Sequence, residues 1–114
     1  EKLDRLQNRG IICILCKNKE GHVDLQDAMK KLGEKDIDSI LLEGGGTLNF
    51  SAIEEGIVDQ LVVFIAPKLI GGKDAKTFLE GRGFSKMASA VQLDGIEMSL
   101  IGQDIIICGY PKKR

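Results

Sequence analysis

The chain has 114 residues, of which 43% are hydrophobic and 29% charged, so it holds enough apolar material for one domain and is too hydrophobic for intrinsic disorder. With a formal net charge of −1, four Phe and one Tyr, it offers no basic or base-stacking surface for nucleic acid. No apolar run approaches the roughly 20 residues of a membrane span and no targeting segment is visible, so we expect a cytoplasmic protein without a membrane partner.

The first segment, residues 1–8, is charged and has leucines three residues apart, which predicts the end of a helix with Gly10 as its C-cap. A helix that begins at residue 1 without a start signal predicts that the chain is part of a longer protein. The next run, Ile11–Cys16, is continuously apolar and predicts a strand buried on both faces, as in a parallel sheet.

Cys13 and Cys16 have the spacing of a redox or zinc pair, but positions three apart in a strand point to opposite faces. His22 is the only histidine, and it stands in a turn-like stretch typical of a surface loop. We therefore expect no metal site. With Cys108 the cysteine count is odd, which favours free, buried thiols in a reducing cytosol.

A second helix is predicted after Asp24, a good N-cap, and before Gly33, which can end it. Its apolar positions recur at helical spacing: Leu25, Ala28, Met29 and Leu32. Ser39–Leu42 predicts the second strand, and Leu61–Ala66 the third, stopped by Pro67.

Between these strands, a third helix is predicted to start at Thr47 or the preceding glycines and to end at Gly56. Its apolar side carries Leu48, Ala52 and Ile53. Alternation of strand and helix predicts three parallel strands joined by right-handed crossovers.

The pattern changes after residue 67, where glycine-rich loops precede two alternating segments. Residues 90–101 alternate but are interrupted at Asp94-Gly95, and Gly102-Gln103-Asp104 predicts a turn into the apolar run at 105–108. We expect an antiparallel hairpin that closes the sheet.

The most informative stretch is Glu43-Gly44-Gly45-Gly46-Thr47, where a predicted strand ends in glycines and opens into a helix. Glycines let backbone amides approach an anion closely, and a helix start adds unpaired N–H groups and partial positive charge. Because a carboxylate repels phosphate, Glu43 is expected to contact a second, hydroxyl- or amine-bearing ligand. The alternative is a tight strand–helix turn that binds nothing.

The glycines do not form a standard nucleotide motif. A dinucleotide fingerprint needs glycine where Asn49 stands, and no Gly-Lys-Ser/Thr follows, as a P-loop requires. Lys68 and Lys73 can add positive charge after the third strand, although most loop lysines are merely solvated.

Three ordered motifs, at residues 38–48, 56–61 and 65–72, and the ending at 101–111 resemble one family. That family is the carboxyl-terminal reductase domain of the bifunctional riboflavin biosynthesis deaminase/reductase. The resemblance implies a dihydrofolate-reductase-like α/β fold, with a mostly parallel sheet, helices on its faces and a C-terminal antiparallel hairpin.

The resemblance also implies an enzyme that reduces the ribosyl group of 5-amino-6-(5-phosphoribosylamino)uracil to the ribityl compound with NADPH. Glu43 would bind the substrate, and no catalytic residue is assigned. The residues implied to bind the cofactor are Gly44, Gly45, Gly46, Thr47, Leu48, Asn49, Phe50 and Ser51.

This chain departs from the family in length, because the family's reductase domain is about twice as long. Residues 1–114 are therefore expected to be one partial domain, the second half of the reductase domain, and to be inactive alone. The motifs of the fused zinc deaminase are absent from this sequence. The resemblance further implies a homodimer. Two alternatives stay open: a dihydrofolate-reductase-like enzyme with another substrate, and a non-catalytic nucleotide-binding or oligomerisation module.

Overall fold

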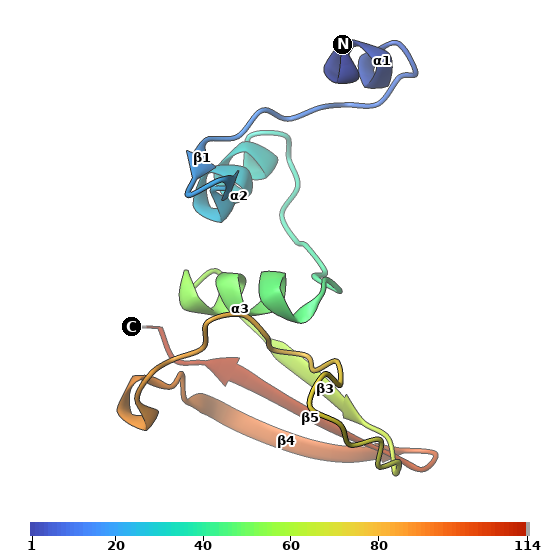
Figure 1. Cartoon of the computed structure of the whole chain (residues 1–114), viewed down its shortest axis with the longest axis vertical. Coiled ribbons are helices and arrows are strands. Elements are labelled where there is room, and N and C mark those ends of the chain that lie inside the picture. The colour runs from blue at the N-terminus through green and yellow to red at the C-terminus, as the bar shows by residue number, and fades with distance from the viewer. Residues whose placement is uncertain (114) are drawn as a thin grey trace. The chain divides into compact units, whose positions relative to one another are not determined.

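The computed structural model describes residues 1–113 (Figure 1), so Arg114 at the end of the basic tail lies outside the described residues. The chain divides into two compact units, Glu1–Leu41 and Leu42–Arg114. The expectation that residues 1–114 form one partial domain stays a prediction.

The first unit contains two helices and a short hairpin. Helix α1 covers Lys2–Gln7, strands β1 and β2 cover Asn18–Lys19 and His22–Val23, and helix α2 covers Leu25–Gly33. The two-residue hairpin turn, Glu20-Gly21, has φ angles of 53° and 85°, as a type I′ turn requires. His22 therefore lies in an exposed short strand, where a surface loop was expected.

The ends of α2 are set by local hydrogen bonds. The Asp24 side chain accepts from the backbone N–H of Asp27 at 3.0 Å, which confirms the predicted N-cap. The helix ends at Gly33, as predicted, and the chain then turns at Asp36, with φ of 60°. There the N–H of Ile37 donates to the carbonyl of Leu32, as in a Schellman motif.

The same motif ends the other two helices at the predicted glycines. Gly10 has φ of 75° and follows α1, and Gly56 has φ of 69° and follows α3, which covers Gly46–Glu54. The residue after each glycine donates its N–H back to the fifth residue before it, Leu6 and Ala52 respectively. Gly10 and Gly56 therefore follow the helix ends as predicted, although the C-cap residues themselves are Asn8 and Glu55.

The predicted strand at residues 11–16 is not formed among the described residues, and neither is the one at 39–42. Both segments are extended chain with exposed apolar side chains; Ile12 is 79% exposed and Leu41 83%. An apolar run favours burial, but a strand also needs a neighbouring backbone to accept its hydrogen bonds. No described segment supplies one, so the predicted parallel pairing is wrong for residues 1–113.

The second unit is built on a three-stranded sheet. Strand β3 covers Leu61–Ile65, β4 covers Leu93–Ile101 and β5 covers Asp104–Pro111; a 3₁₀ turn, η1, covers Met87–Ser89. The strand order is β3-β5-β4, and both pairings are antiparallel. Helix α3 lies along this sheet (Figure 1).

The C-terminal hairpin is confirmed. Ile101 pairs with Asp104 across the two-residue turn Gly102-Gln103, and Gly102 has φ of 61°. The predicted interruption is a register shift between Asp94 and Glu97. Strand β3, however, pairs antiparallel with β5, not with parallel neighbours.

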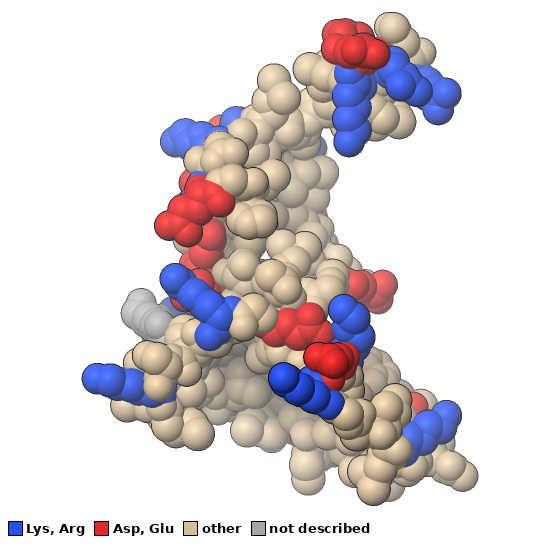
Figure 2. Space-filling model, viewed as in Figure 1, with Lys and Arg blue, Asp and Glu red and all other residues tan. Residues whose placement is uncertain are grey.

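The described chain buries few apolar side chains. Phe50, Ala52 and Ile106 are the buried hydrophobic residues, whereas many others on the sheet are exposed. Of the residues expected on the apolar side of α3, Ala52 is buried but Leu48 is 41% exposed. Figure 2 shows Lys and Arg side chains interspersed with Asp and Glu on the face in view.

The three cysteines are free thiols and half-buried, not core residues. Residues 1–113 contain no cluster of three or more His, Cys, Asp and Glu side chains placed to bind a metal ion. In the same range, no helix has both the length and the apolar content needed to cross a bilayer.

Candidate cofactor site at the start of helix α3

The glycine stretch lies where the chain enters α3. Gly45 is the N-cap, with φ of −67° and ψ of 161°, and the helix begins at Gly46. No side chain caps this end of the helix. The N–H groups of the first turn have no acceptor within an α-helix, so this terminus can bind an anion through its main chain.

The three glycines have different surroundings. A Cβ on Gly46 would lie 2.6 Å from Cγ of Glu80 and 2.8 Å from the carbonyl oxygen of Thr77, so the chain passes too close for any side chain. A Cβ on Gly44 would lie 2.9 Å from Cδ2 of Leu48. A Cβ on Gly45 would have no atom within 4 Å, so the space above Gly45 is open.

The rest of the first two turns is largely engaged inside the protein. Asn49 donates through Nδ2 to the carbonyl oxygen of Phe78 at 3.0 Å, and the Ser51 hydroxyl donates to the carbonyl oxygen of Thr47 at 3.1 Å. The Phe50 ring is buried and lies 5.1 Å, centroid to centroid, from the Phe84 ring. The open side of this terminus is therefore mainly backbone.

Glu43 is exposed and stands two residues before the helix N-cap. Its carboxylate is thus at the same end of α3 as the open face of Gly45. Lys68 and Lys73 are exposed residues of the loop that follows β3. Within residues 1–113, no hydrogen bond or ion pair connects either lysine to the glycines, so their contribution to an anion site stays a prediction.

Sequence reasoning missed the segment that packs against this terminus. Residues 77–84 contact α3 through Gly46, Asn49 and Phe50, although they lie about 30 positions further along the chain. Their sequence shows only loop-forming glycines. The contact is a tertiary one, and no local pattern in the sequence predicts it.

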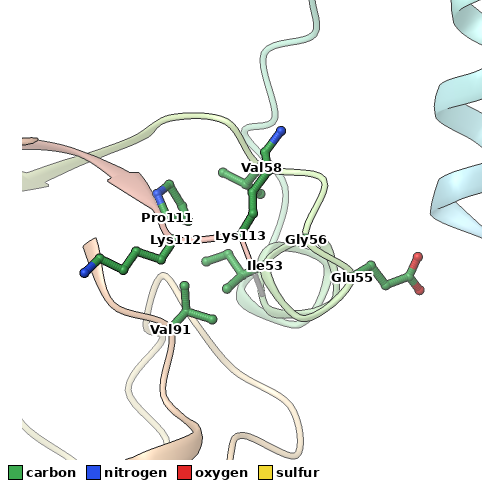
Figure 3. Close-up of a pocket in the computed structure, with 8 residues that line it drawn as sticks. All are labelled: Ile53, Glu55, Gly56, Val58, Val91, Pro111, Lys112 and Lys113. Atoms are coloured by element: carbon green, nitrogen blue, oxygen red, sulfur yellow. The ribbon is translucent and has the colours of Figure 1, made fainter. Parts of the chain in front are cut away.

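A hollow of about 240 Å³ lies at the other end of α3 (Figure 3). Ile53, Val58 and Val91 provide apolar side chains, while the Glu55 carboxylate points away from them. Lys112 and Lys113 at its rim are paired with Asp94 and Asp59, each at 3.2 Å. Both lysines thus have carboxylate partners, and a nine-residue helix separates the hollow from the glycines.

Comparison with known sequences matches residues 1–107 to the family described as the RibD C-terminal domain. The chain is 48% identical over 107 residues to riboflavin biosynthesis protein RibD of Actinobacillus pleuropneumoniae, covering 94% of this chain and 28% of that protein. It is 40% identical over 85 residues to a 2,5-diamino-6-ribosylamino-4(3H)-pyrimidinone 5′-phosphate reductase of Methanothermobacter thermautotrophicus, covering 75% and 39%. The chain thus spans well under half the length of these relatives.

Solved structures show the same fold. RibD of Acinetobacter baumannii superimposes with a TM-score of 0.80 at 23% identity, over 96% of this chain and 29% of that one. A pyrimidine reductase-like protein of Corynebacterium diphtheriae gives 0.73 at 23% identity, over 99% and 44%. The dihydrofolate-reductase-like fold expected from the resemblance is confirmed, and the chain belongs to the RibD C-terminal domain family.

Proposed function

We propose that this chain is the cofactor-binding part of an NADPH-dependent pyrimidine reductase of riboflavin biosynthesis. The complete enzyme would reduce the ribosyl group of 5-amino-6-(5-phosphoribosylamino)uracil to the ribityl compound. Membership of the family and the names of its relatives support this reaction class. The observation that carries the proposal is the open space above Gly45 at an uncapped helix start.

The geometry of Gly45 supports a phosphate contact. Its backbone angles are accessible to any residue, and a Cβ there would touch nothing within the protein. Neither backbone strain nor packing therefore calls for glycine at this position. Close approach of a ligand to the main chain does, because a Cβ would stand between the amides and the phosphate oxygens.

The implied cofactor residues divide by what they can offer. The first-turn N–H groups of Gly46, Thr47 and Leu48 would hold the pyrophosphate. Asn49, Phe50 and Ser51 use their side chains within the protein, so they would support this turn and offer main-chain contacts only. The proposed cofactor site would therefore consist mainly of backbone N–H groups, which suit a pyrophosphate.

When bound, the nicotinamide supplies the hydride that reduces C1′ of the opened ribose. Glu43 would accept a hydrogen bond from a ribose hydroxyl or from the amine of the substrate and so orient the sugar. Its exposed carboxylate lies before the glycines and outside the helix, which supports separate roles for Glu43 in substrate binding and for the glycines in cofactor binding. Because this carboxylate would repel the cofactor phosphates, it is better suited to contact the uncharged hydroxyl or amine groups of the substrate.

A second substrate is favoured by one specific relative. The Methanothermobacter thermautotrophicus protein is named for a substrate that retains two amino groups on the pyrimidine. The ribose chemistry is the same, so Glu43 would serve either compound.

Three further properties complete the proposal. The enzyme would act in the cytoplasm, and a zinc deaminase domain would be fused to it in the full-length protein. It would form a homodimer through its sheet and C-terminal strands. Support for the dimer comes from β4, where Ile96, Met98 and Leu100 are each more than half exposed.

The test uses the complete enzyme. We expect it to oxidise NADPH, followed by absorbance, when either pyrimidine is supplied, and Glu43→Ala to lose at least about tenfold in kcat/KM, since a lost charge-assisted hydrogen bond is worth about 1.5–3 kcal/mol. NADPH affinity, measured by fluorescence titration, should stay at the wild-type value in this variant. Unchanged turnover in Glu43→Ala would reject its role, and no turnover with either compound would reject the proposed reaction.

A further inference from the structure

The segment of residues 77–84, here called the clamp segment, packs against the first turns of α3. The Phe78 carbonyl oxygen accepts from Asn49 Nδ2 at 3.0 Å, and Gly46 leaves no room for a Cβ beside Thr77 and Glu80. The Phe84 ring meets the buried Phe50 ring. The clamp segment thus touches α3 on its first and second turns.

A salt bridge attaches the clamp segment further along the helix. Arg82 donates through both Nε and Nη2 to Oε1 of Glu54, at 3.2 Å and 2.6 Å. Between these points, Gly81 lies close to Thr47 and Phe50, since a Cβ there would be 3.8 Å and 3.7 Å from their side chains. Contacts therefore run along the whole length of α3.

The clamp segment has a fixed local conformation. Oε1 of Glu80 accepts from the Thr77 backbone N–H at 3.0 Å, and the Thr77 hydroxyl donates to the Leu79 carbonyl oxygen at 2.6 Å. Gly81 follows with φ of +96°, a conformation that other residues rarely adopt. The half-buried Glu80 side chain thus closes a turn and places its stem against Gly46.

An uncapped helix start frays unless something else holds it. No side chain caps α3, and the clamp segment contacts its first turn at Gly46 and Thr47. We infer that Glu80 is a positioning residue, which holds the clamp segment against α3 and so keeps the first-turn N–H groups aimed at the cofactor phosphates. This inference rests on the proposed function, because it concerns the affinity of that same site for NADPH.

The test compares two substitutions of Glu80 in the complete enzyme. Glu80→Ala removes the acceptor for Thr77 and the stem beside Gly46, and we expect the Kd for NADPH, from fluorescence titration, to rise roughly 3- to 10-fold. Glu80→Gln keeps both the stem and an acceptor oxygen, so we expect it to restore the wild-type Kd. Glu97→Ala, an exposed carboxylate on β4, is the matched control and should leave the Kd unchanged.

Two readouts separate positioning from a merely structural role. At saturating NADPH, kcat of Glu80→Ala should equal that of the wild type while KM for NADPH rises. Amide hydrogen exchange without ligand should quicken at residues 46–48 in Glu80→Ala and not in Glu80→Gln. If Glu80→Ala does not fold, Gly81→Ala strains the same turn while its Cβ makes only ordinary van der Waals contacts with Thr47 and Phe50, and it should raise the Kd in its place.

The outcomes distinguish the two proposals. Wild-type enzyme that does not bind NADPH would reject the proposed function and this inference together. Wild-type binding with an unchanged Kd in Glu80→Ala, or a raised Kd that Glu80→Gln does not restore, would overturn the inference about Glu80 alone.

Discussion

The three consecutive glycines before and at the start of α3 have different surroundings. Gly46 is required by packing, because Glu80 and a backbone carbonyl leave no room for a Cβ. Gly44 lies against Leu48. Gly45 alone is constrained by nothing within the described residues, which makes it the position where a substitution reports on a ligand and not on the fold.

The prediction at the residue scale is that Gly45→Val and Gly46→Ala fail in different ways. Gly45→Val should cost about 0.5–1 kcal/mol of unfolding free energy, from the weaker N-cap preference of valine, yet lower NADPH affinity at least tenfold through bulk at the pyrophosphate. Gly46→Ala should cost about 1–3 kcal/mol by overpacking. Denaturant unfolding and NADPH titration measure both, and wild-type affinity in Gly45→Val would contradict the phosphate site.

The candidate site was predictable from sequence only in part. Glu43 and the glycines were identified because a strand-like run, glycines and a helix start are neighbours in the chain. The roles of Asn49 and Phe50 were not predictable in this way. Their side chains face residues 77–84, and contacts between segments this far apart depend on how the chain returns in space.

Helices were predicted well, because their signals are local. The capping carboxylate of Asp24 and the left-handed glycines at 10 and 56 act within one or two turns of the helix end. The exception is Asp36, which adopts a left-handed conformation although it is not glycine. Gly33, the expected stop, is the last residue of α2.

Helix α2 is tied to the extended segment before it by one carboxylate. Oδ2 of Asp27 accepts from the backbone N–H of Lys17 at 2.8 Å and lies 2.9 Å from Nζ of Lys31, which also donates to the Leu15 carbonyl oxygen. The hydrogen bond from Lys31, and next that from Lys17, lower the pKa of Asp27. The bond to Asp27 in turn raises the pKa of Lys31.

These shifts predict how stability depends on pH. A carboxyl whose pKa is lowered by folding stabilises the protein above its unfolded pKa, about 3.9, and that contribution is lost as pH falls through the folded pKa. The raised pKa of Lys31 acts at the alkaline end, where stabilisation is lost only as pH rises through its folded value. Asp27→Asn cannot titrate, so its melting temperature should fall less than that of the wild type on acidification.

The measurement is the melting temperature of both proteins from about pH 7 down to about pH 3, across the range where carboxyls protonate. Asp38→Asn is the matched control, because Asp38 is exposed, and it should keep the acid dependence of the wild type. Parallel curves for the wild type and Asp27→Asn would show that this carboxyl does not couple folding to protons.

At the scale of the whole molecule, the amount of exposed apolar surface is the main feature. Besides Ile12 and Leu41, the strand β4 exposes a row of large side chains, with Met98 73% and Leu100 71% exposed. Surfaces of this kind mark contacts with other protein segments. The relatives are far longer than this chain, so they contain further segments that can pack on such a surface. The proposed dimer would bury part of it as well.

The dimer predicts opposite results for neighbouring residues of β4. Met98 and Leu100 lie on one face of the sheet, and Ser99 between them lies on the other. Leu100→Glu should shift the complete enzyme from dimer to monomer by light scattering, because it places a charge in the apolar interface. Ser99→Glu should leave the dimer intact, and equal masses for both variants would contradict an interface on this face.

Local signals in the sequence were sufficient for the starts of α2 and α3, the helix stops and the C-terminal hairpin, because each depends on residues a few positions apart. They also sufficed for the family, since the motifs are ordered along the chain. The pairing of β3 with β5, the unpaired apolar segments at 11–16 and 39–42 and the packing of residues 77–84 on α3 were decided only in three dimensions. The physical reason is that apolar content favours the burial of a segment, whereas the partner that would bury it depends on which backbone and side chains reach it in the fold.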